Sequence, residues 1–284
     1  MNEENLRAPD VTVVVVSYGS EAVLPAFLDS LGPASSMPLR TIVVDNKPAG
    51  GAVEGLAEAR GLEYLPLENP GYGAAVNRAV FGLAVETKWL LITNPDVTMD
   101  PGSIDLLVGA GEKDERIGSV GPLIRDAEGG IYPSARRLPR LTTGTGHALF
   151  GRVWRGNPWS QEYRQANEEP VARDAEWLSG ACLLVRSTAF RAIDGFDESF
   201  FMYFEDVDLG ARLLHAGYRN RYQPAASVTH TGAHSTERSV SAMVAAHHES
   251  AYRFLAKRYP GPLLWPVRQA LRLGLQVRSR HSRR

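Results

Sequence analysis

The sequence predicts an α/β protein with a mostly parallel central sheet, because buried strand-like runs alternate with short helical segments. Val11–Ser17 reads VTVVVVS and Thr41–Asp45 reads TIVVD, which are β-branched runs typical of strands covered on both faces. A third strand is expected at Leu62–Leu67 and a fourth at Lys88–Asn94. Strands that alternate with helices of about ten residues form right-handed βαβ units, so we expect a sheet of this kind.

Polar side chains stand where the first three predicted strands end. Ser17 and Tyr18 close the first strand, Asp45-Asn46 closes the second, and Asn69 follows the third. In open parallel sheets, ligands bind at the carboxyl ends of the strands. No G-x-G-x-x-G follows the first strand, which argues against a Rossmann dinucleotide site.

A glycine-rich turn precedes the next helix in Asn69–Arg78, which reads NPGYGAAVNR. Gly71 and Gly73 allow close approach of the backbone to a phosphate or sugar, with the helix amides as donors. An ordinary Pro-Gly connector is the alternative interpretation.

The fourth strand ends in Asn94-Pro95-Asp96. Pro95 keeps the backbone extended and projects Asp96 beyond the sheet edge, where a carboxylate can hold Mg²⁺ or Mn²⁺ bound to a diphosphate. An aspartate in an ordinary turn is the other interpretation. Asp100-Pro101 is predicted to cap the following helix, with Pro101 at its first position.

The middle of the chain predicts an acceptor-side region. A β-excursion is expected around Gly129–Gly130. Residues 144–164 form a long irregular segment that is either functional or disordered, and its aromatic and arginine side chains favour a lid over sugar and phosphate. Trp177–Val185 reads as one apolar strand, in which Ser179-Gly180 marks a close approach to the backbone.

The stretch Phe196–Tyr218 carries the strongest sign of catalysis. Its aromatic first part predicts a buried or half-buried strand and loop, and Glu205, Asp206 and Asp208 then open a helix that stops near Gly217. The helix dipole explains one or two acids at that end. Three acids behind so apolar a run favour a reaction or a metal site, because burial of charge demands a partner.

Bulk properties favour a cytoplasmic globular protein. The chain has 284 residues, a net charge of −1 and a single cysteine, Cys182, so no internal disulfide is expected. No signal peptide opens it, and no stretch approaches the ~18 apolar residues of a spanning helix.

The C-terminal part is strongly basic. After Glu249 the chain has nine Lys and Arg residues and no acid. Ser241–Tyr259 is predicted to be helical, and Leu263–Val277 forms an amphipathic cationic helix with Trp265, suited to a membrane surface. A solvated helix packed on the body is the alternative, a basic tail could also bind nucleic acid, and the helix after Ser241 could pair two subunits.

In collinear order, VSY, VVDN, NPGYGAAVNRA, NPDV, WLSGACLLVR, GFDESFFMYFEDVDL and H-x-x-x-H-S resemble family 2 glycosyltransferases of the GT-A fold, over about Val11–Ser235. The resemblance implies a catalytic domain at 1–235, with a nucleotide-binding half at about 10–100 and an acceptor half at about 117–235. A helical, basic extension follows at 236–284.

The resemblance also implies a role for each matching residue. Asp206 is the expected general base of an inverting transfer, and Asp96 and His230 are expected metal ligands for Mg²⁺ or Mn²⁺. His234 is expected to bind phosphate. The expected donor contacts are Ser17, Tyr18, Asp45, Gly71, Gly73, Asn77 and Asn94, and the expected acceptor contacts are Trp177, Ser179, Gly180 and Glu205. The chain departs from the family at Asn94, where many relatives have the first Asp of D-x-D.

Three further segments, GPLIRDAEGGIYPSARRLP, RGNPWSQEYRQ and AHHES, resemble the rhamnosyltransferases of actinobacterial cell-wall linker assembly. This implies transfer of L-rhamnose from dTDP-rhamnose to the GlcNAc of a polyprenyl-diphosphate acceptor, building the arabinogalactan–peptidoglycan linker, by an enzyme on the inner face of the plasma membrane. A transferase that uses UDP-galactofuranose or a UDP-hexose is the alternative within the class. A non-catalytic nucleotide-sugar or nucleic-acid binder is the alternative outside it, and Asp96, Glu205, Asp206 and His230 argue against such a binder.

Overall fold

The computed structural model describes residues 9–140, 170–232 and 240–266, together with 268, 269 and 272. In the first part, the elements are β1 Val11–Ser17, α1 Leu24–Ala34, β2 Leu39–Asp45, α2 Ala52–Ala59, β3 Glu63–Pro66, α3 Tyr72–Gly82, β4 Trp89–Thr93, β5 Val97–Met99, α4 Ser103–Gly111, β6 Ile117–Arg125, β7 Ile131–Tyr132 and β8 Ala135–Arg136. In the second part, they are β9 Arg173–Ala175, β10 Trp177–Leu178, β11 Cys182–Arg186, α7 Ser187–Ala192, α8 Glu205–His215, β12 Arg219–His230, α9 Val240–Arg258 and a 3₁₀ turn at Pro262–Leu264.

One mixed sheet organises the molecule, in the order β3-β2-β1-β4-β11-β6-β12-β5. The first four strands of this order are parallel, as the βαβ pattern predicted, and β11 then runs antiparallel to both β4 and β6. The predicted β-excursion is confirmed, because β7 folds back onto β6 as an antiparallel pair. Parallel order in the N-terminal half brings the carboxyl ends of β1, β2 and β4 to one edge.

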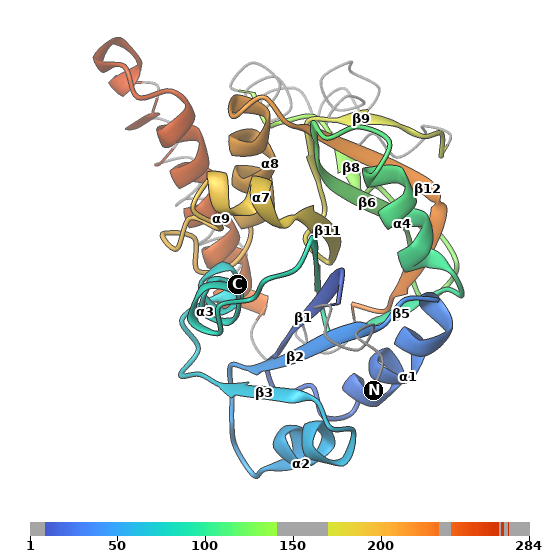
Figure 1. The fold of residues 1–284 in the computed structure, drawn as a ribbon. Coiled ribbons are helices and arrows are strands. Elements are labelled where there is room, and N and C mark those ends of the chain that lie inside the picture. Colours follow the sequence, from blue (N-terminus) through green and yellow to red (C-terminus); the bar gives the residue numbers. More distant parts are fainter. Residues whose placement is uncertain (1–8, 141–169, 233–239, 267, 270–271, 273–284) are drawn as a thin grey trace.

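Helices cover both faces of the sheet and make three layers (Figure 1). The alternation of side chains in β1 divides its valines between two cores: Val13 and Val15 pack on the face covered by α1, α2 and α4, whereas Val14 and Val16 pack on the face covered by α3, α7 and α8. All of these valines are buried, which explains why the run has no polar alternation.

The apolar segment Trp177–Val185 is not one strand. Trp177–Leu178 pairs with β8 in a separate two-stranded sheet, and the chain turns at Ser179–Ala181 before β11 enters the main sheet. The strand expected within the first part of Phe196–Tyr218 is also absent, because residues 196–204 form bends and turns. The apolar run at 182–185 is buried, whereas in the aromatic segment Phe196 and Phe200 are buried and Phe201 is 48% exposed, so an apolar pattern alone does not define a strand.

The predicted helix cap at Asp100-Pro101 is wrong. Helix α4 begins at Ser103, and its N-cap residue is Gly102 with φ +71° and no capping side chain. Asp100 contributes its backbone carbonyl, which accepts a hydrogen bond from the Ser103 amide over 3.1 Å. A tight turn with a left-handed glycine therefore replaces the predicted Asp cap.

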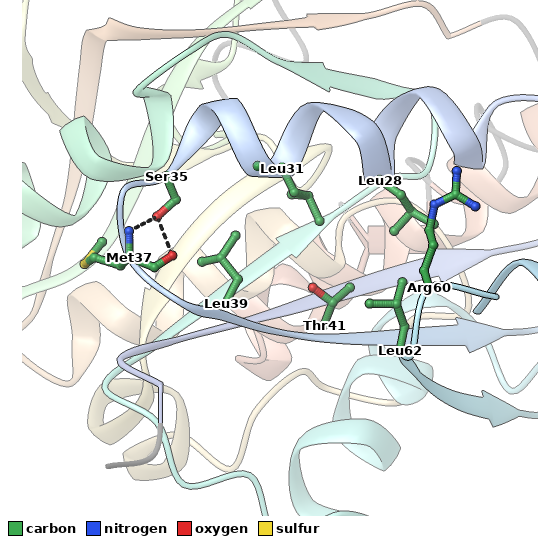
Figure 2. Close-up of a pocket in the computed structure, with 9 residues that line it drawn as sticks. Leu28, Leu31, Ser35, Met37, Leu39, Thr41, Arg60 and Leu62 are labelled. Atoms are coloured by element: carbon green, nitrogen blue, oxygen red, sulfur yellow. Dashed lines mark hydrogen bonds between the residues drawn. The ribbon is translucent and has the colours of Figure 1, made fainter. Parts of the chain in front are cut away.

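A cavity of about 310 Å³ lies between α1 and the start of β2 (Figure 2). Leu28 and Leu31 of α1 face Leu39 and Thr41 of β2 across it. Leu39 and Thr41 belong to the amino-terminal half of β2, so the cavity lies away from the carboxyl edge where the predicted ligand site is found.

The C-terminal helix α9 packs beside α8, and it confirms the helix expected after Ser241. Within the described ranges, no helix is long and apolar enough to cross a membrane. Most of the amphipathic helix predicted at Leu263–Val277, the predicted lid at 144–164 and the predicted domain boundary at 235 lie outside the described residues.

Candidate active site

The ends of β1 and β2 form the first part of the site. The register pairs Ser17 with Asp45 at the last position of both strands. One carboxylate oxygen of Asp45 accepts the Lys47 amide over 3.0 Å, and the other accepts the Tyr64 hydroxyl over 3.1 Å. Burial and the neighbouring Asp45 carboxylate raise the pKa of Tyr64 to about 12, so its hydroxyl keeps its proton and holds Asp45 in place.

Two polar atoms at this edge are buried without a hydrogen-bond partner in the described part of the chain. They are Ser17 Oγ and Asn46 Oδ1. Beside them, the Tyr18 ring is 57% exposed, with Lys47 Nζ 5.5 Å from its centroid. Unpaired buried polar atoms next to an exposed aromatic face fit a planar polar ligand, because such a ligand satisfies both. Asn46 stands with Asp45 at the ligand-binding end of the second strand, as the sequence predicted, but no specific role was expected for it.

Asn94, Asp96 and His230 come together at the next part of the edge. His230 ends β12, and its pairing with Val97 of β5 places it beside the turn after β4. Its Nε2 lies 3.2 Å from Asp96 Oδ1 and 3.3 Å from Asn94 Nδ2. Burial raises the pKa of Asp96, but the hydrogen bond and charge of His230 outweigh it, so the pKa lies below its ordinary value.

These residues fit a divalent cation shared with a substrate diphosphate. In the described part of the chain, no cluster of three or more His, Cys, Asp or Glu side chains could hold a metal. Asp96 and His230 supply two ligands, and the Asn94 amide lies next to them. Mg²⁺ is commonly held by one or two carboxylates with substrate phosphates and water completing its shell, so this small donor set suffices when a diphosphate is bound.

The turn between β10 and β11 links this edge to the acidic helix. The backbone N–H of Asn94 donates to the Ala181 carbonyl over 2.9 Å, which places residues 180 and 181 beside the end of β4. The Gly180 amide then donates to Asp206 Oδ2 over 2.9 Å. The backbone at Gly180 is therefore the close-approach point that the sequence predicted, and its partner is the Asp206 carboxylate.

Asp206 sits in the first turn of α8, as predicted from the acidic cluster. Burial raises its pKa above the ordinary value, although the amides of Gly180 and Val207 donate to it and oppose the shift. Both carboxylate oxygens thus have one amide donor each, which fixes the orientation of the group. A carboxylate held this way with a raised proton affinity is suited to general-base catalysis.

Glu205 is the more deeply buried partner of the pair. It is 9% exposed, and its Oε2 has no hydrogen-bond partner in the described part of the chain. Burial and the adjacent Asp206 charge raise its pKa. The two carboxyls interact, so they titrate as a pair rather than as independent groups.

Replacing Glu205 by Gln is expected to stabilise the fold at pH 8 and not at pH 4. A carboxyl with a raised folded-state pKa stabilises the protein below its unfolded pKa, and this contribution is lost as pH rises through the folded value. Gln carries no such cost, and each kcal/mol gained raises Tm by about 2–4 °C. Thermal unfolding at both pH values, with the exposed Glu58→Gln on α2 as control, checks this. An equal gain at pH 4 and pH 8 would contradict it.

The glycine-rich turn packs against the aromatic segment 196–204. A Cβ at Gly71, whose φ is +104°, would meet the Phe201 carbonyl oxygen at 2.5 Å, and one at Gly73 would meet Phe196 Cβ at 2.7 Å. The Asn77 amide group both donates to and accepts from the Phe196 backbone, over 2.8 and 2.9 Å. These three residues therefore have packing partners, and their contact with the ribose and diphosphate stays a prediction.

Replacing Gly73 by Ala is expected to destabilise the protein by about 1–3 kcal/mol, because the new methyl group overlaps Phe196 in a filled core. Gly82→Ala in the same helix is the matched control, since a Cβ there meets nothing within 4 Å and Ala favours helix. Urea unfolding of both variants checks the prediction. Equal stability of the two variants would show that the Phe196 contact is not tight.

Tyr72 is a site residue that sequence reasoning passed over between the two glycines. Its hydroxyl donates to the Gly180 carbonyl over 3.0 Å, on the peptide unit next to the amide that holds Asp206. Burial raises its pKa well above the ordinary value, with contributions from Glu205, Asp206 and Asp96. Tyr72 therefore lies among all three carboxyls and keeps its proton.

Aromatic and basic side chains gather around the residues that were predicted to contact the acceptor. Trp177 donates its indole N–H to the Arg137 carbonyl over 3.0 Å, and the Arg136 guanidinium lies 5.6 Å from the Trp177 ring and 5.2 Å from the Tyr132 ring. The Arg136 charge also opposes the rise in the pKa of Asp206, which places the guanidinium within electrostatic reach of that carboxyl. Ser179 is buried beside them, whereas His234 lies outside the described residues.

Comparison with known proteins gives a consistent result. A family model described as "Glycosyltransferase like family 2" matches residues 9–248. The N-acetylglucosaminyl-diphospho-decaprenol L-rhamnosyltransferase of Mycobacterium tuberculosis is 45% identical over 295 residues, which cover 96% of this chain and 95% of the relative. The rhamnosyltransferase WbbL of Escherichia coli is 28% identical and covers 87% of this chain and 93% of the relative.

Among solved structures, the mannosyltransferase PcManGT from Pyrobaculum calidifontis, in complex with GDP-Man and Mn²⁺, aligns with a TM-score of 0.59. It is 18% identical, and the alignment covers 95% of this chain and 70% of that protein. The expected fold class is thereby confirmed.

Proposed function

The chain belongs to glycosyltransferase-like family 2 and is a glycosyltransferase, and we propose that it transfers L-rhamnose from dTDP-rhamnose to the GlcNAc of a polyprenyl-diphosphate acceptor. The observation that carries the proposal is the 45% identity, over nearly the whole of both chains, to a relative named for rhamnosyl transfer to N-acetylglucosaminyl-diphospho-decaprenol. Three features of the site support the proposal. The Asp206 carboxylate is held by two backbone amides, Asp96 and His230 lie close enough to share a cation, and Trp177 offers an aromatic face to an acceptor sugar.

Asp206 is the proposed general base. It takes the proton of the attacking GlcNAc hydroxyl while the oxygen forms a bond to the anomeric carbon of rhamnose, and the bond to the dTDP oxygen breaks on the opposite side, with inversion. The amides of Gly180 and Val207 aim the carboxylate, and its raised pKa makes it a better proton acceptor than a free aspartate.

The donor nucleotide is proposed to occupy the ends of β1 and β2. Ser17, Asp45 and the Asn46 side chain offer polar contacts to a pyrimidine, and the exposed ring of Tyr18 offers a stacking face. The diphosphate then extends toward Asn94 and Asp96, since β4 lies next to β1 in the sheet.

Asp96 and His230 are the proposed ligands of a divalent cation, Mg²⁺ or Mn²⁺, with Asn94 beside them. When bound, the cation supplies Lewis-acid charge for the departing diphosphate. Asp96 brings the negative charge that attracts it. With Asn94 in place of a second carboxylate, the chain relies on the substrate for further ligands.

The acceptor sugar is proposed to lie on Trp177, with Ser179, Gly180 and Glu205 at its edge. Aromatic faces stack on sugars, and Arg136 beside Trp177 brings positive charge for the acceptor diphosphate. Glu205, held protonated by its raised pKa, can donate a hydrogen bond to a sugar hydroxyl.

The C-terminal extension at 236–284 is proposed to bring the enzyme to the cytoplasmic face of the plasma membrane. Leu263 is 93% exposed and Trp265 is 57% exposed just after α9, and the nine basic residues that follow Glu249 suit an anionic lipid surface. An acceptor with a polyprenyl chain must be met at such a surface.

Transfer is tested with dTDP-rhamnose and with UDP-galactofuranose as donors, on a synthetic polyprenyl-diphospho-GlcNAc acceptor, with Mg²⁺, Mn²⁺ or EDTA. Rhamnosyl product from dTDP-rhamnose, lost in EDTA, is expected. Turnover of UDP-galactofuranose alone would keep the enzyme class and reject the donor. Turnover of dTDP-rhamnose only on a different sugar acceptor would reject the acceptor.

A further inference from the structure

Helix α9 presents one face to the segment that leads into the base. His247, Ser250, Phe254 and Lys257 lie three or four residues apart, so they share a face of the helix. The His247 ring is 5.3 Å from the Phe204 ring, Ser250 Oγ donates to the Met202 carbonyl over 2.9 Å, and the buried Phe254 ring lies 5.8 Å from Phe204. Figure 1 shows α9 running along α8 on the outside of the molecule.

The segment that α9 covers has an unfavourable backbone. Tyr203 and Phe204 have φ values of +66° and +64°, in the left-handed region that residues other than glycine seldom adopt. They directly precede Glu205 and Asp206. Such a conformation persists only when surrounding contacts fix it, and it is often found at functional sites.

Lys257 holds both ends of this segment. Its Nζ lies 2.7 Å from Asp197 Oδ2, before the aromatic run, and 2.7 Å from Asp208 Oδ1, two residues after Asp206. The Asp208 side chain is 3% exposed, and Arg212 binds its other oxygen at 2.6 Å. Burial alone would raise the pKa of Asp197, but the hydrogen bonds from Lys257 and Ser199 and the Lys257 charge outweigh it and lower the pKa to about 2.

We propose that Lys257 is a positioning residue for glycosyl transfer: by bridging Asp197 and Asp208 it clamps the strained turn before α8 and keeps Asp206 aimed at the acceptor hydroxyl. Lys257 lies beyond residue 248, where the family match ends, so the C-terminal helix contributes to the site through this clamp. The proposal rests on the proposed function for the role of Asp206 as the base and for the identity of the transferred group.

The variants are Lys257→Met, which keeps an unbranched apolar side chain but removes the ammonium group that lies 5.9 Å from the Phe200 ring centroid, and Lys257→Arg, which keeps a cation able to reach two carboxylates. Lys88→Met is the matched control, because the Lys88 side chain is about as exposed as that of Lys257 and its removal breaks a 2.6 Å ion pair with Glu112. Lys88 stands just before β4, at the opposite end of that strand from Asn94. Steady-state kinetics, Tm and amide hydrogen exchange are measured on the full chain.

Lys257→Met is expected to lower kcat by about 10- to 100-fold, because small misplacements of a reacting group have effects of this order, while the donor KM changes by less than about threefold. Lys257→Arg recovers most of the loss, and Lys88→Met shows none. A loss that Arg does not recover, a loss shared by Lys88→Met, or a rise in KM with kcat unchanged would each overturn the proposal.

Hydrogen exchange separates this proposal from the proposed function, because it needs no substrate. Amides of residues 200–208 are expected to exchange faster in Lys257→Met, with β1 and β4 unchanged. If the wild type transfers no rhamnose, the donor assignment fails, and unchanged exchange at 200–208 would then overturn the clamp while faster exchange there would support it.

Discussion

Replacing Asp206 by Asn is expected to lower kcat by about 10²–10⁴-fold, the contribution of a positioned general base, with donor affinity retained. Asn has the same shape and can still accept the Gly180 amide, so the turn at Ser179–Ala181 keeps its place. The attacking hydroxyl, however, finds no group that takes its proton. Steady-state kinetics measure the loss, and calorimetric titration with the donor measures binding.

Asp29→Asn is the matched control, because Asp29 is an exposed carboxylate of α1 paired with Arg60 and remote from the site. Activity of Asp206→Asn above about a tenth of wild type would lie outside the range for a general base and would mean that another carboxylate is the base. Loss of donor affinity would instead assign Asp206 to donor binding.

The pH dependence of the wild type follows from the same pair. The base must be ionised to accept a proton, and burial raises the pKa of Asp206. A free aspartate titrates near pH 4, so the acid limb of the kcat profile is expected at a higher pH than that. Because Glu205 and Asp206 interact, the limb reports the pair. An acid limb at or below pH 4 would contradict a buried base.

Asp96→Asn is expected to lower kcat by about 10²–10³-fold with Mn²⁺ present, since cation charge on a leaving diphosphate is worth several kcal/mol. His230 then remains as one ligand beside two amides, a set with little affinity for a hard cation. Electron paramagnetic resonance of Mn²⁺ with donor present should show weaker binding. Wild type in EDTA should lose activity to a similar extent.

Two variants bracket this result. Asp100 directly follows β5, whose other end pairs with His230. The variant Asp100→Asn should therefore bind Mn²⁺ as wild type does. Asn94→Asp places a second carboxylate beside His230 and should bind Mn²⁺ more tightly. Full activity of Asp96→Asn in EDTA would show that the transfer does not depend on a cation held at Asp96.

The sequence predicted what short-range physics controls. Val11–Ser17 could be recognised as a buried parallel strand because β-branched residues without alternation need cover on both faces. The start of α8 could be placed because its acids follow an aromatic run and match the helix dipole. Where local preference competes with packing, prediction failed: Trp177–Val185 divides between two sheets, and Gly102 replaces the Asp100 cap.

The family resemblance predicted which residues act in the site, but which of them touch one another depends on the fold. Asp96 and His230, far apart in the chain, meet only because β12 pairs with β5. Gly180 reaches Asp206 only because β11 lies antiparallel to β4 and turns back at its start. Tyr72 carries no sequence pattern of its own, and its importance comes from the carboxyl groups and the Gly180 carbonyl that surround it.

By itself, the sequence determined the α/β class, the strand-end polar residues and the acidic start of α8, since each depends on neighbours within a few residues. Only the tertiary structure decided that Lys257 forms an ion pair with Asp208, which lies 49 residues earlier in the chain and two residues after Asp206. Such a pairing depends on which surface α9 covers, and that is set by the packing of Phe254 and its neighbours rather than by any local preference.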